Sequence, residues 1–219
     1  MVVWLGDLGR DLSEPERNYW LSFNVPPDGR KISTTNFKRA ILGEFADPSR
    51  PDLVFKHELK SFQTHFRGKF GWDLILPLHA HDEHYLTALR CLSKDSQSDF
   101  DAQLIALAKI LIDSLNESEL AKRGAKSNPN DKGITKFENY LRENGVLRFE
   151  NHIKMLRVLQ DLRSKSAAHR KGGNYETLIA ELQLADEGQQ RTFDRLLTAA
   201  AELLAFLRST LIDPQGLTP

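Results

Sequence analysis

The residues with the clearest chemical potential are an arginine and a histidine, Arg163 and His169, in the stretch LRSKSAAHRKGG. A histidine titrates near neutral pH, so it can accept or donate a proton during a reaction. A fixed arginine can hold a phosphate and the negative charge that develops on it. These two residue types together suit chemistry on a phosphodiester.

The helix that carries the arginine is strongly amphipathic. Apolar residues recur from Phe149 onward, and at about 100° per residue they fill one wide arc of the helix. Arg163 falls inside this arc, between Leu159 and Leu156. Because an unpaired buried charge is very costly, its guanidinium must meet a carboxylate, reach a solvated edge or line a site.

The chain as a whole is neutral, but the segment around the pair is not. Lys plus Arg (30) equal Asp plus Glu (30), so no bulk field draws the whole molecule to nucleic acid or to an anionic membrane. Residues 148–173, however, contain seven Lys or Arg against two acidic residues. If the helix ends near Ala168, the next turn can bring the His169 imidazole back beside Arg163. The neutral chain thus contains a positive segment.

An arginine followed after four to six residues by a histidine, at the end of a helix in a helical bundle, resembles the R-x4-6-H motif of the HEPN superfamily. The resemblance covers about residues 98–212 and is carried by the helix order and by RSKSAAH. It implies a metal-independent endoribonuclease without a cofactor, in which Arg163 and His169 are catalytic. It also implies a homodimer whose two motifs share one cleft, with a role in a bacterial defence or toxin-like system.

The resemblance also suggests which residues bind RNA and leaves a second function open. The histidine would move the proton of a 2′-hydroxyl or of a leaving 5′-oxygen, and RNA contacts are expected from neighbouring residues, namely Ser164, Lys165, Arg170 and Lys171. Ser164 stands where active members often carry Asn, Asp or His. The alternative is a non-catalytic module for dimerisation or protein interaction, in which Arg163 pairs with an acid of a neighbouring helix and His169 lies in a loop or caps the helix end.

A second cluster of potential ligands is the string HAHDEH, residues 79–84, which is similar to the H-x-H-x-D-H element of metallo-β-lactamase-like hydrolases. Glu83 takes the place of the aspartate. That fold needs further ligands on later strands, whereas only His152 and His169 follow, both in the helical half. We therefore expect a solvated strand-to-helix turn with no metal, and His152 as a packing residue.

The remaining pattern predicts an α+β protein that is predominantly α. Residues 1–97 are predicted to form a small mixed α/β region with strands near 2–5, 19–25 and 72–78. Residues 98–213 are predicted to form a bundle of four or five helices, and residues 214–219 a tail. The aromatic residues of the first region, among them Trp4, Trp20 and Trp72, are expected in the core rather than in base stacking.

Local signals predict where these helices begin and end. Pro51 and Gly68 suit the two ends of a helix that carries an aromatic stripe from Phe55 to Phe66, and Ser98 with Asp101 could cap the next helix. A loop is expected at 122–133. Further helices are expected at about 134–141, 149–168, 175–184 and 193–211.

Composition limits the class of protein. The chain of 219 residues is 40% hydrophobic and 27% charged, which is typical of a folded protein. Its single cysteine, Cys91, cannot form an internal disulfide, and no leader segment opens the chain, so we expect a cytoplasmic protein. Apolar runs are broken by charge too early to span a membrane. The abrupt start, MVVWLGDLG, is compatible with a native N-terminus and with a longer protein upstream.

Overall fold

The computed structural model describes residues 12–23, 50–124, 130–167 and 188–213, without the side chains of residues 165–167. These residues form eight α-helices and one π-helical turn, and they contain no strand. In chain order the elements are α2 (Glu14–Leu21), α4 (Pro51–Phe70), α5 (Glu83–Ala88), α6 (Gln97–Leu111), α7 (Glu117–Arg123), α8 (Gly133–Glu143), α9 (Glu150–Ala167), α11 (Gly188–Leu207) and η2 (Arg208–Ile212).

The chain divides into two compact units, residues 1–46 and 47–219. In the first unit, helix α2 replaces part of the strand predicted at 19–25, while residues 24–25 and the strand predicted at 2–5 lie outside the described residues. A capping box explains the helix, because the Glu16 carboxylate accepts hydrogen bonds from the Ser13 backbone N–H (3.0 Å) and hydroxyl (2.6 Å). Trp20, expected in the core, is 41% exposed.

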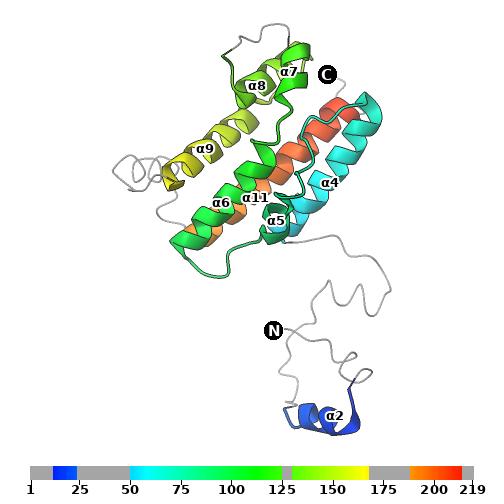
Figure 1. Ribbon diagram of the computed structural model, residues 1–219, viewed down its shortest axis with the longest axis vertical. Coiled ribbons are helices and arrows are strands. Elements are labelled where there is room, and N and C mark those ends of the chain that lie inside the picture. Colours follow the sequence, from blue (N-terminus) through cyan, green and yellow to red (C-terminus); the bar gives the residue numbers. More distant parts are fainter. Residues whose placement is uncertain (1–11, 24–49, 125–129, 168–187, 214–219) are drawn as a thin grey trace. The chain divides into compact units, whose positions relative to one another are not determined.

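The second unit is a helical bundle built around α11, as predicted from the helical periodicity. Helix α11 packs against α4, α6 and α9, and Figure 1 shows it running alongside α4. The aromatic stripe of α4 is buried, as are the apolar residues of α11. The central core side chains are Phe55, Phe62, Phe66, Leu104, Leu107, Leu159, Leu162, Phe193, Leu197 and Leu204. Burial of these apolar faces against one another is the main force that holds the bundle together.

Helices α4 and α5, assigned from the sequence to a separate N-terminal region, belong to the same compact unit as the later helices. Helix α4 packs on α11 and α5 packs on α6, so the helical unit begins at residue 47 instead of 98. The apolar stripe of α4 is buried where this helix packs against α11. Part of the region thought to be mixed α/β is therefore part of the bundle.

The strand predicted at 72–78 is an extended segment with a single antiparallel bridge, between Ile75 and Leu115. The Leu76 N–H donates to the carbonyl oxygen of Ser114 (2.7 Å), and the Asn116 N–H donates to that of Leu74 (3.0 Å). The facing chain is the turn after α6, which is too short to act as a second strand. A strand needs a neighbour of similar length, so the β-propensity of these residues does not produce a sheet.

Several helix ends differ from those predicted. Helix α4 continues past Gly68 to Phe70 and ends at Gly71, whose φ of 74° is left-handed and favours glycine. Helix α6 begins after Ser96, so the predicted cap at Ser98 and Asp101 is wrong. Helix α7 lies partly in the predicted loop and was not predicted.

The last helices follow the prediction more closely. Helix α8 ends at Asn144 and Gly145, and α9 occupies the predicted range up to residue 167. The helical piece expected at 175–184 lies outside the described residues. None of the helices in the described part of the chain combines the length and the apolar character needed to cross a membrane.

Candidate functional site

Helix α9 places Arg163 at the border between the core and solvent. Its residues Ile153, Leu156, Leu159 and Leu162 are buried, and α9 packs against α6 and α11. Arg163 follows directly after Leu162, and its side chain is 26% exposed. The guanidinium thus lies at a partly solvated edge of the apolar face, one of the three environments expected for it.

The same guanidinium also meets a carboxylate. Arg163 Nη1 donates to Asp113 Oδ1 at 2.7 Å, and the Asp113 side chain is 38% exposed. Asp113 follows α6, where its backbone N–H donates to the Ala108 carbonyl oxygen (3.1 Å). An arginine has five N–H donors, and no second acceptor for this guanidinium lies among the described residues. Arg163 is therefore oriented by one contact and can still donate to an anion.

The other predicted site residues are only partly within the described chain. Ser164 is exposed, and its hydroxyl donates to the Gln160 carbonyl oxygen on its own helix (2.8 Å). The side chain of Lys165 and all of His169, Arg170 and Lys171 lie outside the described residues. The approach of His169 to Arg163 stays a prediction.

Acidic residues of other elements neutralise part of the positive segment. Arg157 of α9 and Arg142 of α8 both pair with Glu138, while Arg163 pairs with Asp113. Lys154 has no hydrogen bond or ion pair within the described part of the chain. Sequence spacing could not reveal these acids, because Glu138 and Asp113 lie 19 and 50 residues from their partners on α9.

His152 is a packing residue, as expected. Its ring lies against that of Phe206 on α11, with 4.6 Å between ring centroids and 30° between ring planes. Burial lowers the pKa of His152, and the nearby Glu202 carboxylate opposes this by raising it. The neutral form is thus favoured in the bundle, which suits stacking on an aromatic ring.

The histidine-rich string forms a turn that leads into α5. The rings of His79 and His81 are stacked, with centroids 5.2 Å apart, and His84 Nδ1 lies 2.8 Å from the His81 carbonyl oxygen. Asp82 pairs with Lys109 of α6 at 3.6 Å. Among the residues that the structure describes, no three or more His, Cys, Asp or Glu side chains are arranged to hold a metal ion.

A buried polar cluster that the sequence did not suggest surrounds the start of α4. Asp52, only 3% exposed, accepts hydrogen bonds from Arg50 Nη2 (2.8 Å) and Nε (3.1 Å) and from the Cys91 thiol (3.3 Å). Burial raises the pKa of Cys91 to about 11. Because the thiolate is the nucleophilic form, this cysteine is suited to structure and not to catalysis.

Comparisons of the chain with protein-family models, with curated proteins and with solved structures found no match.

Proposed function

We propose that the helical unit is a HEPN-like, metal-independent endoribonuclease in which Arg163 and His169 carry out the reaction. The observation that supports this proposal is the position of Arg163, held at a partly exposed edge of α9 by Asp113. An arginine fixed by a single carboxylate contact needs little rearrangement to bind a phosphate with its remaining N–H donors. Preorganised charge of this kind is an effective means of stabilising a transition state.

In the proposed reaction, the 2′-hydroxyl oxygen of RNA attacks the adjacent phosphorus, and the bond to the 5′-oxygen breaks. His169 takes the proton of the 2′-hydroxyl or supplies one to the leaving 5′-oxygen, in this subunit or its mate. Arg163 holds the phosphoryl oxygens, and Asp113 orients the guanidinium. The products carry a 2′,3′-cyclic phosphate and a 5′-hydroxyl.

RNA contacts in this proposal come from the residues beside the pair, namely Ser164, Lys165, Arg170 and Lys171. The exposed position of Ser164 is compatible with a phosphate backbone passing over the end of α9. A homodimer would bring two such surfaces into one cleft. A bacterial defence or toxin-like complex, or a longer protein, is the proposed setting.

The second candidate is a non-catalytic module of the same type, used for dimerisation or protein interaction. The Arg163–Asp113 pair itself favours it, because this contact already gives the arginine an opposite charge within one bundle. Under this alternative Ser164 marks a site that has lost its activity.

Analysis of the reaction products separates the two candidates. Single-stranded RNA and DNA of the same sequence are incubated with the protein in EDTA, and the ends of any fragments are identified. The ribonuclease proposal expects RNA to be cut, cyclic phosphate ends, and intact DNA. Cleavage of DNA, or RNA products with 3′-hydroxyl ends, would contradict a mechanism that uses the 2′-hydroxyl.

A further inference from the structure

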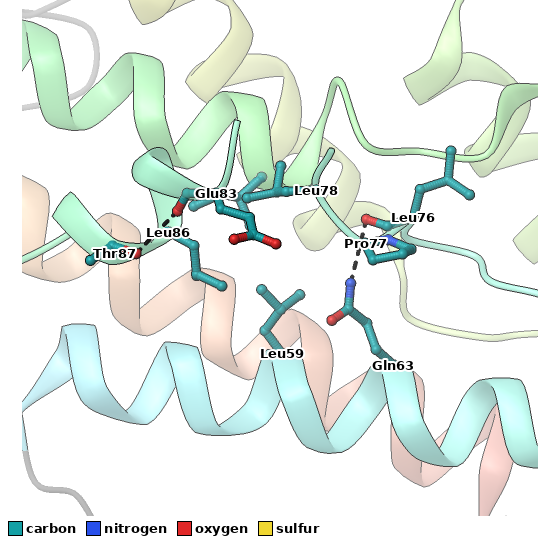
Figure 2. A pocket seen from close by; sticks show the side chains of 9 residues that line it. Leu59, Gln63, Leu76, Pro77, Leu78, Glu83, Leu86 and Thr87 are labelled. Carbon is teal, nitrogen blue, oxygen red and sulfur yellow. Dashed lines mark hydrogen bonds between the residues drawn. The ribbon is translucent and has the colours of Figure 1, made fainter. Parts of the chain in front are cut away.

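A pocket of about 280 Å³ lies between α4, the extended segment at 76–78, α5 and α6 (Figure 2). Buried Leu59 and Ile110 form its floor, and exposed residues of the extended segment and of α5 form its rim. Most of its lining is apolar, from Leu59, Leu76, Pro77, Leu78, Leu86 and Ile110. Since a cavity of about 150 Å³ with walls of this kind can bind benzene, this pocket can hold a somewhat larger apolar molecule.

The walls of the pocket are held by contacts to neighbouring parts of the bundle. The Leu76 N–H donates to the Ser114 carbonyl oxygen (2.7 Å), which fixes the extended segment. Lys56 Nζ donates to the Thr87 carbonyl oxygen (3.3 Å), which ties the end of α5 to α4. Helix α5 also packs against α6. A ligand therefore meets a pocket that is already formed, and binding costs little ordering of the chain.

The polar groups of the lining are largely bonded to the protein itself. Gln63 Nε2 donates to the carbonyl oxygens of Ile75 (3.2 Å) and Leu76 (3.4 Å). The Thr87 hydroxyl donates to the Glu83 carbonyl oxygen (3.2 Å). In the part of the chain that the structure describes, no donor contacts Gln63 Oε1. This oxygen is thus an acceptor for a hydroxyl group on a ligand.

The charged groups beside the pocket are of both signs and are exposed. Glu83 is the charged residue of the lining, and Lys60 lies on α4 between Leu59 and Gln63. Because both residues are exposed, water screens their attraction for an ion of opposite sign. An ion that enters a pocket lined mainly by leucines loses hydration and gains no buried counter-charge. The pocket therefore favours a neutral ligand over an ion of either sign.

We propose that this pocket binds a small neutral alcohol with an unbranched alkyl chain, about the size of hexanol. The alkyl chain contacts Leu59, Leu86 and Ile110, and the hydroxyl group donates to Gln63 Oε1. Burial of the chain supplies most of the affinity, and the hydroxyl orients the molecule. The proposal does not depend on Arg163, so its failure would leave the ribonuclease proposal unaffected.

Methyl NMR of the full chain, labelled in its Leu and Ile methyl groups, tests the ligand and its location together. Butanol, pentanol and hexanol should shift the signals of Leu59 and Ile110 saturably, and each added methylene should strengthen binding roughly fourfold. Hexylamine and hexanoate should both bind at least about tenfold more weakly than hexanol. Leu197, a core residue outside the lining, should not shift. No saturable shift at the pocket, or binding of either ion as tight as that of hexanol, would overturn the proposal.

Variants separate the apolar walls from the charges at the rim. Glu83→Gln and Lys60→Gln each remove one charge and should change the affinity for hexanol less than about twofold, because the ligand is neutral. Leu86→Phe, at a half-buried lining position, should take up part of the pocket and weaken hexanol binding at least about tenfold. Leu147→Phe, at an exposed position outside the lining, is the matched control and should bind as wild type.

Thermal melting checks that each variant is folded before its affinity is compared with that of wild type. A tenfold or larger change in folded Glu83→Gln or Lys60→Gln protein would show that charge governs binding and would overturn the choice of a neutral ligand. Unchanged binding in folded Leu86→Phe protein would place the alcohol outside this pocket.

Discussion

The guanidinium of Arg163 on α9 lies 2.7 Å from the carboxylate of Asp113, which follows α6, although 50 residues separate the two in the chain. The contact ties the end of the candidate catalytic helix to its neighbour. It also explains how an arginine is tolerated beside the apolar face of α9, because the guanidinium pairs with a carboxylate and remains partly solvated. Whether the contact serves catalysis or only packing can be decided by experiment.

The first prediction concerns Asp113→Asn, which removes the charge and keeps the shape. Because both partners are partly exposed, the free energy of unfolding should fall by less than about 1 kcal/mol in a denaturant titration. If Asp113 orients Arg163 for catalysis, the rate of RNA cleavage should fall about tenfold or more. Asp161→Asn, at an exposed position of α9, is the control and should change neither quantity. Wild-type cleavage by Asp113→Asn would show that Asp113 has no positioning role.

The second prediction concerns Cys91, whose burial raises the thiol pKa to about 11. At about pH 8, three units below this value, only about one thiol in a thousand is ionised, so a disulfide reagent such as DTNB should react slowly with the native protein. Unfolding in guanidinium should accelerate the reaction at least about tenfold, because the ionised fraction rises by more than the intrinsic nucleophilicity of the thiolate falls. Equal rates in the native and unfolded protein would show that the thiol is not held against Asp52 as described.

The third prediction concerns the pH dependence of stability. Burial lowers the pKa of His152 in the folded bundle below its ordinary value of 6.5. Below about pH 6.5, His152 therefore binds a proton more readily in the unfolded chain than in the folded protein. The contribution of His152 to stability is therefore present above about pH 6.5 and is lost as the pH falls through the folded pKa. In urea titrations, His152→Phe keeps an aromatic ring against Phe206 and should lose less stability than wild type between neutral and acidic pH. His81→Phe, on the surface turn, is the control and should lose as much stability as wild type. Identical losses of stability in His152→Phe and wild type would contradict the prediction.

The fourth prediction concerns assembly, which the ribonuclease proposal requires. Light scattering at micromolar concentration should give a mass near twice the 24.9 kDa of one chain. The dimer is expected to pair the ends of two α9 helices. A monomer at every concentration tested would remove the shared cleft on which the proposal depends.

Helical periodicity predicted most of the bundle, because apolar residues spaced for one face must be buried against another face. The stripes of α4, α6, α9 and α11 are buried as expected. Helix α7 was not predicted because it is short and buries only Leu120, which leaves no periodic signal. The strand expected from Tyr19 failed because local capping by Ser13 and Glu16 favours a helix over intrinsic β-propensity.

The candidate site was predictable only in part. The position of Arg163 on α9 and its need for a partner follow from the helical arc, and the structure agrees with both. The identity of the partner could not be predicted, since Asp113 follows another helix and only the packing of α6 on α9 brings it close. The place of His169 relative to Arg163 stays a prediction.

The central claim is that Arg163 and His169 form a ribonuclease site, and the fifth prediction tests it through His169→Ala. Removal of the proton-transfer group should slow cleavage of single-stranded RNA in EDTA by roughly 10²–10⁴-fold. The sequence places His169 near a helix end and among polar residues, so the melting temperature should change little. His81→Ala controls for the loss of a surface histidine and should cleave at the wild-type rate.

Arg163→Ala should also slow cleavage, but its melting temperature must be compared first, because the side chain shares the apolar arc of α9 and loss of its packing can destabilise the bundle. The decisive measurement is the initial rate of RNA cleavage by wild type, His169→Ala and His81→Ala, each purified in the same way and shown to be folded. The account predicts a large loss in His169→Ala alone. Equal rates in all three proteins, or no cleavage by wild type, would contradict it and leave the non-catalytic module as the function of this bundle.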